Sequence, residues 1–219
     1  MADAEAQIPR VFIVRHGETE WAKIGKHTGK SDIELTPLGI RQVASTASQL
    51  VGPGKLLDPT KLIKIFVSPR KRALQTFETL LGQQHGEISG DDRITITEDI
   101  AEWDYVSCHH MFCPHLRATH LIIVLTVIYR SPQQVAEHLG RLVEQIKDLQ
   151  RPFMRGEKAA DVLIVAHGLI LRVFVKRWLG YPVDFPLSML MMPGSVGILT
   201  LNHSSEEPAF QIGMALPAA

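Results

Sequence analysis

The chain has 219 residues, 45% of them hydrophobic and 21% charged, which suffices for one soluble α/β domain with a sizeable core. The 23 basic and 23 acidic residues cancel, which argues against a nucleic-acid or membrane-surface binder but allows a local basic pocket. The first ten residues have no apolar signal core, and the apolar run 121–129 is too short to span a bilayer. Two cysteines, Cys108 and Cys113, are too few for a disulfide scaffold, so we expect a cytoplasmic protein.

Strand and helix patterns alternate along the chain. Residues 11–14 are all β-branched or aromatic, which predicts a short buried strand. Thr36-Pro37 is typical of a helix N-cap followed by proline, and the apolar spacing after it predicts a helix to residue 51. The same reasoning predicts strands at 62–67, 94–97, 162–166 and 196–201, and helices that start at Ser68-Pro69, Ser131-Pro132 and Leu169. This alternation predicts a single domain over 1–219, a three-layer α/β/α sandwich with a mostly parallel central sheet.

Two of the predicted strands run directly into a histidine followed by glycine. The first ends in Arg15-His16-Gly17, and the strand at 162–166 ends in His167-Gly168. If the two strands are neighbours, both imidazoles meet at the carboxyl edge of the sheet, where open α/β proteins bind ligands. A neutral histidine nitrogen is a competent nucleophile, and the fork of Arg15 suits a phosphate or a carboxylate.

A third strand end adds further cations. Ser68-Pro69-Arg70-Lys71-Arg72 places arginines at the start of a predicted helix, and helix N-termini favour anions. Each feature by itself has a plain structural interpretation. Arg15-His16-Gly17 can equally be a surface turn, either histidine alone is more commonly a core or rim residue, and residues 70–72 can be a solvated basic turn. Their joint placement at strand ends favours a phosphate site.

Several motifs occur in an order that resembles a known family. The chain is similar to the histidine phosphatase (phosphoglycerate mutase-like) superfamily along 11–105 and 131–202. The motifs that carry this resemblance are Arg15-His16-Gly17-Glu18-Thr19, Thr28-Gly29, Leu35-Thr36-Pro37-Leu38-Gly39, Arg72-Ala73-Leu74-Gln75-Thr76 and Ala166-His167-Gly168. Glu102-Trp103-Asp104-Tyr105 and Glu207-Pro208-Ala209-Phe210 look closest to the fungal sedoheptulose-1,7-bisphosphatase branch.

The resemblance implies a phosphatase that hydrolyses a sugar phosphate, with a bisphosphorylated ketose as the favoured substrate and no metal or cofactor. His16 would attack phosphorus and carry a phosphohistidine, while Glu102 would protonate the leaving oxygen and then deprotonate water. The phosphoryl oxygens would be bound by Arg15, Arg72 and His167. The other substrate-binding residues that it implies are Thr28, Gly29, Ser68, Tyr105, Gly168 and Arg172. Arg172 would reach a second phosphate, although it is read almost equally well as a surface cation.

The pattern breaks at residues 106–130, where the composition changes abruptly. Cysteines and histidines come first, then the apolar run, and the resemblance returns at Ser131. We interpret the segment as a replacement, such as a retained intron or a mis-joined exon. A zinc site is the weaker interpretation, because the spacing of Cys108, His109, His110, Cys113 and His115 matches no finger or ribbon.

In the family, the segment at these positions helps to cap the pocket, so two other functions stay open for this chain. One is a phosphoglycerate mutase, which would require priming by bisphosphoglycerate. The other is a catalytically impaired phosphate-binding protein that keeps the pocket without its lid. In each case the expected partner is a small phosphorylated metabolite, with no nucleic acid and no membrane, and the sequence does not predict the oligomeric state.

Overall fold

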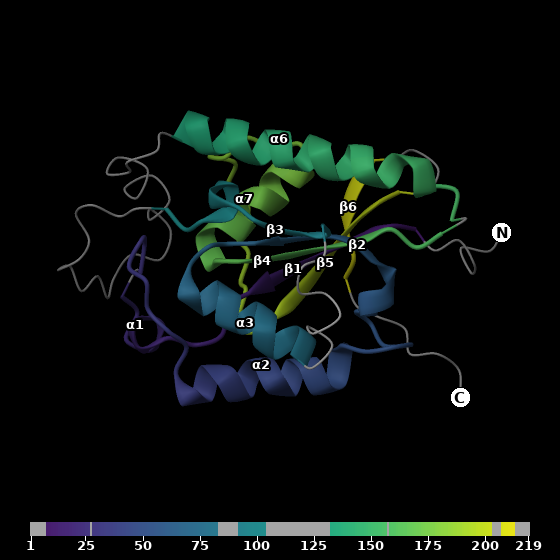
Figure 1. The fold of residues 1–219 in the computed structure, drawn as a ribbon. Coiled ribbons are helices and arrows are strands. Elements are labelled where there is room, and N and C mark those ends of the chain that lie inside the picture. Colours follow the sequence, from purple (N-terminus) through teal and green to yellow (C-terminus); the bar gives the residue numbers. More distant parts are fainter. Residues whose placement is uncertain are drawn as a thin grey trace.

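A mixed sheet forms the centre of the molecule (Figure 1). The structure is a computed structural model that describes residues 8–26, 28–82, 92–103, 132–156, 158–202 and 207–212. The strands of this described part are β1 (Arg10–Arg15), β2 (Leu62–Val67), β3 (Ile94–Ile96), β4 (Asp161–Ala166), β5 (Val196–Leu201) and β6 (Pro208–Phe210). Their order across the sheet is β3-β2-β4-β1-β5-β6. The β1–β5 and β5–β6 pairings are antiparallel, and the other three pairings are parallel.

The two central strands, β1 and β4, explain why the sheet forms here. All six residues of β4 are buried, as are the four apolar residues of β1. Continuous apolar runs of this kind are typical of parallel strands that are covered on both faces. Arg15 pairs with Ala166 in the parallel register, so the chain leaves both strands at the same edge of the sheet.

Helices cover both faces of the sheet (Figure 1). On one face lie α2 (Pro37–Leu50) and α3 (Lys71–Leu81), packed against Phe12 and Val14. On the other face lie α6 (Pro132–Gln150) and α7 (Gly168–Trp178), packed against Val11 and Ile13. The alternating side chains of one strand thus feed two separate cores, and the predicted three-layer α/β/α sandwich is confirmed.

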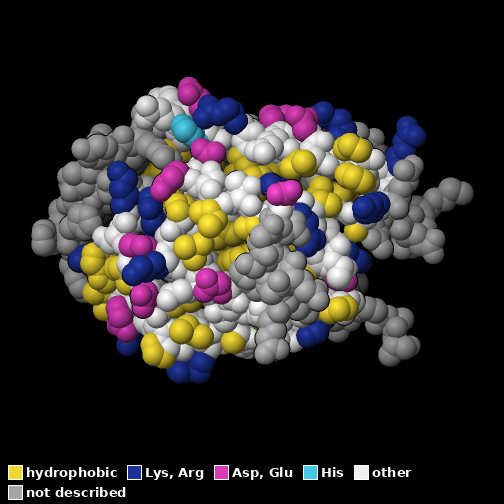
Figure 2. Space-filling view, viewed as in Figure 1, with side chains coloured by type: hydrophobic (Ala, Val, Ile, Leu, Met, Phe, Trp, Pro, Cys, Tyr) yellow, Lys and Arg dark blue, Asp and Glu magenta, His cyan; other side chains and the backbone are white. Residues whose placement is uncertain are grey.

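The shorter elements connect these layers. They are α1 (Glu20–Lys23) and the 3-10 turns η1 (Pro59–Lys61), η3 (Glu98–Ile100) and η4 (Arg151–Phe153). Basic and acidic side chains are interspersed over the face seen in Figure 2, as their equal numbers suggest. None of the helices in the described ranges is long and apolar enough to cross a membrane.

The predicted N-cap is confirmed for α2 and wrong for α3. Thr36 caps α2 as predicted, because its Oγ1 accepts the Gly39 N–H at 2.9 Å and Pro37 follows it. Ser68 does not cap α3, which begins at Lys71 with Arg70 at the N-cap position. The Ser68 hydroxyl lies instead 2.7 Å from His167, so a contact made across the chain replaces the local cap.

Candidate active site

Two imidazole rings meet at the carboxyl edge of the sheet. His16 follows β1 and His167 follows β4, and their ring centroids lie 5.2 Å apart at an interplanar angle of 60°. The two side chains are nearly inaccessible, with exposed fractions of 4% and 0%. The parallel register of β1 and β4 therefore brings together two histidines that are far apart in the sequence.

The hydrogen bond of His16 determines which of its nitrogens is free to react. Nδ1 lies 2.7 Å from the carbonyl oxygen of Gly17, and a carbonyl only accepts, so Nδ1 carries the proton. Nε2 is left with a lone pair. Burial lowers the pKa of His16 to about 3, and the positive charges of Arg72 and Arg15 act in the same direction. The ring is therefore neutral at pH 7 and has the electronic state of a nucleophile.

His167 is fixed by a partner on each side. Arg72 Nε donates to its Nδ1 at 3.1 Å, and Ser68 Oγ lies 2.7 Å from its Nε2. A guanidinium only donates, so Nδ1 is bare and the neutral ring donates through Nε2–H to the serine oxygen. Burial lowers the pKa of His167 well below its usual value, and the charge on Arg72 lowers it further.

Arg72 is the connecting residue of the site. It is completely buried, and its Nη1 and Nη2 donate to the carbonyl oxygens of Ser31 at 2.8 Å and Gly29 at 3.0 Å. A carboxylate oxygen of Asp32 accepts the Lys71 N–H at 2.7 Å. The N-terminus of α3, predicted from the sequence to favour an external anion, thus already carries a carboxylate of the 28–32 loop.

Arg15 lies across the start of α7. A Cβ atom built on Gly168 would come within 3.1 Å of Arg15 Nε, so a side chain at this position would require the guanidinium to shift by a few tenths of an ångström. Nη1 donates to the carbonyl oxygen of Met191 at 2.5 Å, and the buried Nε has no hydrogen-bond partner within the described ranges. Burial lowers the pKa of Arg15, whereas the charge of Glu102 raises it. An oxyanion would satisfy this buried donor.

Glu102 adds a carboxyl group whose charge interacts with those of Arg15 and Arg72. It is partly buried and accepts backbone hydrogen bonds from Trp103, at 3.2 Å, and from Leu169. Burial raises its pKa, against the lowering effects of Arg72 and Arg172. A carboxyl whose pKa is raised holds a proton closer to neutral pH, which is the property that a general acid requires.

The remaining predicted residues differ in how closely they approach this cluster. Thr28 is buried, and Gly29 adopts a left-handed φ of 50° that turns the loop beneath Arg72. Arg172 is exposed and donates to the Gly168 carbonyl at 2.9 Å. Tyr105 and the whole of 106–130, with its cysteines and histidines, lie outside the described residues. Within the described ranges, no group of His, Cys, Asp and Glu side chains is arranged to hold a metal ion.

The sequence reasoning did not identify two contacts that support the site. Thr76 Oγ1 accepts the buried Gly17 N–H at 3.1 Å and donates to the Arg72 carbonyl at 2.7 Å. Its position one helical turn after Arg72 is a signal that could have identified it. The Met191 carbonyl that holds Arg15 has no such signal, because any residue provides the same oxygen.

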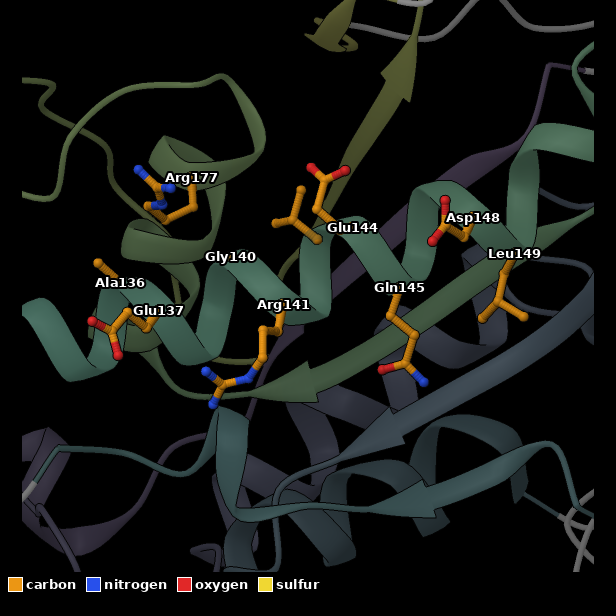
Figure 3. Close-up of a pocket in the computed structure, with 10 residues that line it drawn as sticks. Ala136, Glu137, Gly140, Arg141, Glu144, Gln145, Asp148, Leu149 and Arg177 are labelled. Carbon is orange, nitrogen blue, oxygen red and sulfur yellow. The ribbon is translucent and has the colours of Figure 1, made fainter.

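A separate groove runs along α6 and has a different character. It has a volume of about 880 Å³ and is lined by Ala136, Glu137, Gly140, Arg141, Val143, Glu144, Gln145, Asp148, Leu149 and Arg177. Figure 3 shows Arg141 and Glu144 pointing to opposite sides of the helix, so the charged groups do not converge. None of the predicted site residues lines it, and its mixed signs are typical of a solvated helix face.

The comparisons with known proteins agree with this geometry. The model of the histidine phosphatase superfamily (branch 1) matches residues 11–210. Sedoheptulose 1,7-bisphosphatase of Saccharomyces cerevisiae is 33% identical over 194 residues, which cover 80% of this chain and 69% of that protein. An acid phosphatase of Mycobacterium tuberculosis is 30% identical over 200 residues, which cover 91% of this chain and 90% of that one.

Comparison of the fold with solved structures agrees with the sequence comparisons. The solved structure of an open reading frame product from Mycobacterium tuberculosis superposes with a TM-score of 0.69 at 27% identity, covering 93% of this chain and 96% of that one. The match over 11–210 includes every element that contributes a residue to the histidine cluster. The chain therefore belongs to the histidine phosphatase superfamily.

Proposed function

We propose that this chain is a metal-independent phosphomonoesterase that cleaves a small sugar phosphate through a phosphohistidine on His16. The observation that carries the proposal is the neutral His16 ring with its bare Nε2, which lies beside His167 in the field of Arg72 and Arg15. Phosphoryl transfer requires mainly positioning and stabilisation of charge, and this cluster supplies a nucleophile together with several donors.

In the first half of the reaction, the His16 Nε2 lone pair forms a bond to phosphorus. The bond from phosphorus to the sugar oxygen breaks, and its electrons pass to that oxygen, which takes the proton held by Glu102. Arg15 and Arg72 donate to the phosphoryl oxygens while negative charge redistributes among them, and His167 joins them when a phosphoryl oxygen replaces Ser68 as the acceptor of its Nε2–H. The raised pKa of Glu102 supports its role as the acid of this step.

In the second half, a water oxygen attacks the phosphorus of the phosphohistidine. The proton of that water passes to the Glu102 carboxylate, and the electrons of the nitrogen–phosphorus bond return to Nε2. Inorganic phosphate leaves, and both groups regain their starting protonation states. One carboxyl group thus serves first as acid and then as base, and the cycle needs no additional proton carrier.

We infer that the substrate is a bisphosphorylated ketose. The relative from Saccharomyces cerevisiae is named for sedoheptulose 1,7-bisphosphate, which carries two phosphates. Arg172 begins the second turn of α7 after His167, and its exposed guanidinium lies in the field of Arg15 and Glu102. Its position supports a role in binding the second phosphate, and Thr28, Gly29, Ser68, Gly168 and Tyr105 complete the proposed substrate contacts.

Labelling of the enzyme with a radioactive sugar bisphosphate tests the mechanism directly. We expect an acid-labile phosphoenzyme in the unmodified protein, none in His16→Ala, and slow accumulation of the label in Glu102→Gln. Phosphate release should fall by about a thousandfold or more in His16→Ala. Glu144→Gln, which removes an exposed carboxylate on α6, is the matched control and should behave as the unmodified protein.

The same assay separates the alternative functions. Full activity in His16→Ala would reject the phosphohistidine mechanism. A phosphoglycerate mutase would transfer phosphate only after priming with bisphosphoglycerate, whereas the proposed phosphatase releases phosphate without it. A phosphate-binding protein would bind inorganic phosphate, yet release none from a sugar bisphosphate or an aryl phosphate and acquire no label.

A further inference from the structure

Glu102 lies two residues after the end of a short turn that is tied to the rest of the molecule on two sides. The turn is η3, and its acidic residues Glu98 and Asp99 each engage a base from another part of the chain. Arg70 Nη2 lies 2.9 Å from a carboxylate oxygen of Glu98, and His138 Nδ1 lies 2.8 Å from a carboxylate oxygen of Asp99. Neither pair belongs to the histidine cluster itself.

Each tie connects the turn to a different layer. Arg70 follows Ser68, the partner of His167, by two residues, so the first pair joins the turn to the junction between β2 and α3. His138 lies on α6, so the second pair joins the turn to the opposite core. The turn is held between the two layers, and Glu102 follows Asp99 by three residues.

The backbone between the turn and Glu102 has little freedom of its own. Ala101 N–H donates to the Glu98 carbonyl at 3.1 Å, and the side chains of Ile100 and Trp103 are buried in the core beneath α6. A displacement of Glu98 or Asp99 is therefore transmitted to the carboxyl group of Glu102. Both pairs are partly exposed and contribute little to the free energy of unfolding, whereas general acid catalysis is sensitive to small displacements of the acid.

We propose that the Arg70–Glu98 and Asp99–His138 pairs are positioning elements that orient Glu102 toward the leaving oxygen. The proposal rests on the proposed function, because it assigns these pairs a role through the acid Glu102. A positioning element of this kind affects substrates unequally. It matters when the leaving group needs a proton, and it matters little when the leaving group departs as a stable anion.

The test compares two substrates across Glu98→Gln, Asp99→Asn and the double variant. 4-Nitrophenyl phosphate has a leaving group that needs no proton, whereas fructose 1,6-bisphosphate releases an alkoxide that does. The quantity compared is kcat/KM, which reports the steps up to the phosphoenzyme. In the double variant we expect kcat/KM to fall about tenfold for the sugar phosphate and less than about twofold for the aryl phosphate. The tenfold loss is smaller than the whole contribution of a general acid, because Glu102 itself is still present.

Matched controls separate positioning from general effects. Asp148→Asn and Glu144→Gln remove exposed carboxylates of α6 that pair with Arg151 of η4 and with Lys147, and should leave kcat/KM unchanged for both substrates. Equal losses on the two substrates, or no loss on either, would overturn the positioning role. Glu102→Gln measured alongside decides whether the acid assignment itself holds.

A selective loss in Glu102→Gln without one in the double variant rejects only the positioning proposal. If Glu102→Gln shows no selectivity for the sugar phosphate, the acid assignment fails and the positioning role fails with it.

Discussion

His16 and His167 are buried beside Arg15 and Arg72, so the site is positively charged before either imidazole accepts a proton. Protonating one of these rings would bury a further cation among arginines, and burial together with those charges lowers both pKa values. The two rings stay neutral over the range in which exposed histidines titrate. A neutral nucleophile among cationic side chains suits an anionic substrate, because the charge attracts the phosphate without occupying the attacking lone pair.

The lowered pKa of His16 predicts a measurable loss of stability in acid. The pKa is about 3 in the folded protein and near 6.5 in the unfolded chain. Between these values the unfolded chain binds one more proton, so this contribution to stability is complete above pH 6.5 and falls as the pH decreases toward 3. In His16→Gln, the slope of unfolding free energy against pH should decrease by about 1.4 kcal/mol per pH unit in this window.

Urea unfolding of both proteins at several pH values measures the two slopes. Above pH 7 the slopes should coincide, because His16 is neutral there in both the folded and the unfolded states, and this range is the internal control. Identical slopes below pH 6 would contradict the buried, neutral state of His16.

At the scale of elements, local signals predicted most of the fold. The strands at 62–67 and 196–201 and the cap of α2 agree with the structure because each depends on residues adjacent in sequence. The predicted start of α3 at Ser68-Pro69 was wrong because the Ser68 side chain interacts with His167, which is 99 residues away, instead of capping the helix. The short edge strand β6 was not predicted, since three residues at the margin of a sheet carry too little pattern.

The site was predictable to the extent that strand ends determine it. Two strands that each run into a histidine were enough to predict that His16 and His167 meet, and the parallel register of β1 and β4 brings them together. The contacts of Arg72 with the Gly29 and Ser31 carbonyls were not predictable. Backbone oxygens are the same at every residue, so a sequence cannot indicate which of them a buried arginine will reach.

Two helical glycines should respond oppositely to replacement by alanine, one where α2 meets the loop after β1 and one within α6. A Cβ atom at Gly39 would lie 2.2 Å from the Glu18 carbonyl oxygen, which is backbone and cannot rotate away. Gly39→Ala should therefore destabilise the fold by about 1–3 kcal/mol, as overpacking does. Gly140 lies within α6, and its Cβ would meet Arg177 Nη2 at an ordinary 3.7 Å. Gly140→Ala should stabilise the fold by about 0.5–1 kcal/mol.

Denaturant unfolding of the two variants measures both changes. Because Gly39 contacts the segment between His16 and α1, Gly39→Ala should also reduce kcat, whereas Gly140→Ala should leave it unchanged. Equal stabilities of the two variants would show that the loop after β1 yields without cost.

At the scale of the whole molecule, the site depends on both cores at once. Its groups come from the loop after β1, the β2–α3 junction, the β4–α7 junction and the turn before Glu102. The α2 and α3 layer supplies Arg72, and the α6 and α7 layer supports Trp103, the neighbour of Glu102. The unfolded chain brings none of these groups together, so an oxyanion bound there stabilises only the folded state.

Inorganic phosphate should therefore raise the free energy of unfolding of the intact molecule. At a phosphate concentration about one hundred times its Kd, linkage predicts a gain of about 2.7 kcal/mol. Urea unfolding in phosphate, compared with chloride at equal ionic strength, measures this gain.

Two arginine variants test where the phosphate binds. Arg15→Gln removes the buried donor that has no partner in the described chain and should lose most of the gain. Arg151→Gln removes only an exposed arginine of the Arg151–Asp148 pair and should keep it. A gain of the same size in chloride, or an undiminished gain in Arg15→Gln, would mean that phosphate acts through general ionic effects. A gain confined to phosphate and dependent on Arg15 would locate the oxyanion beside the two histidines.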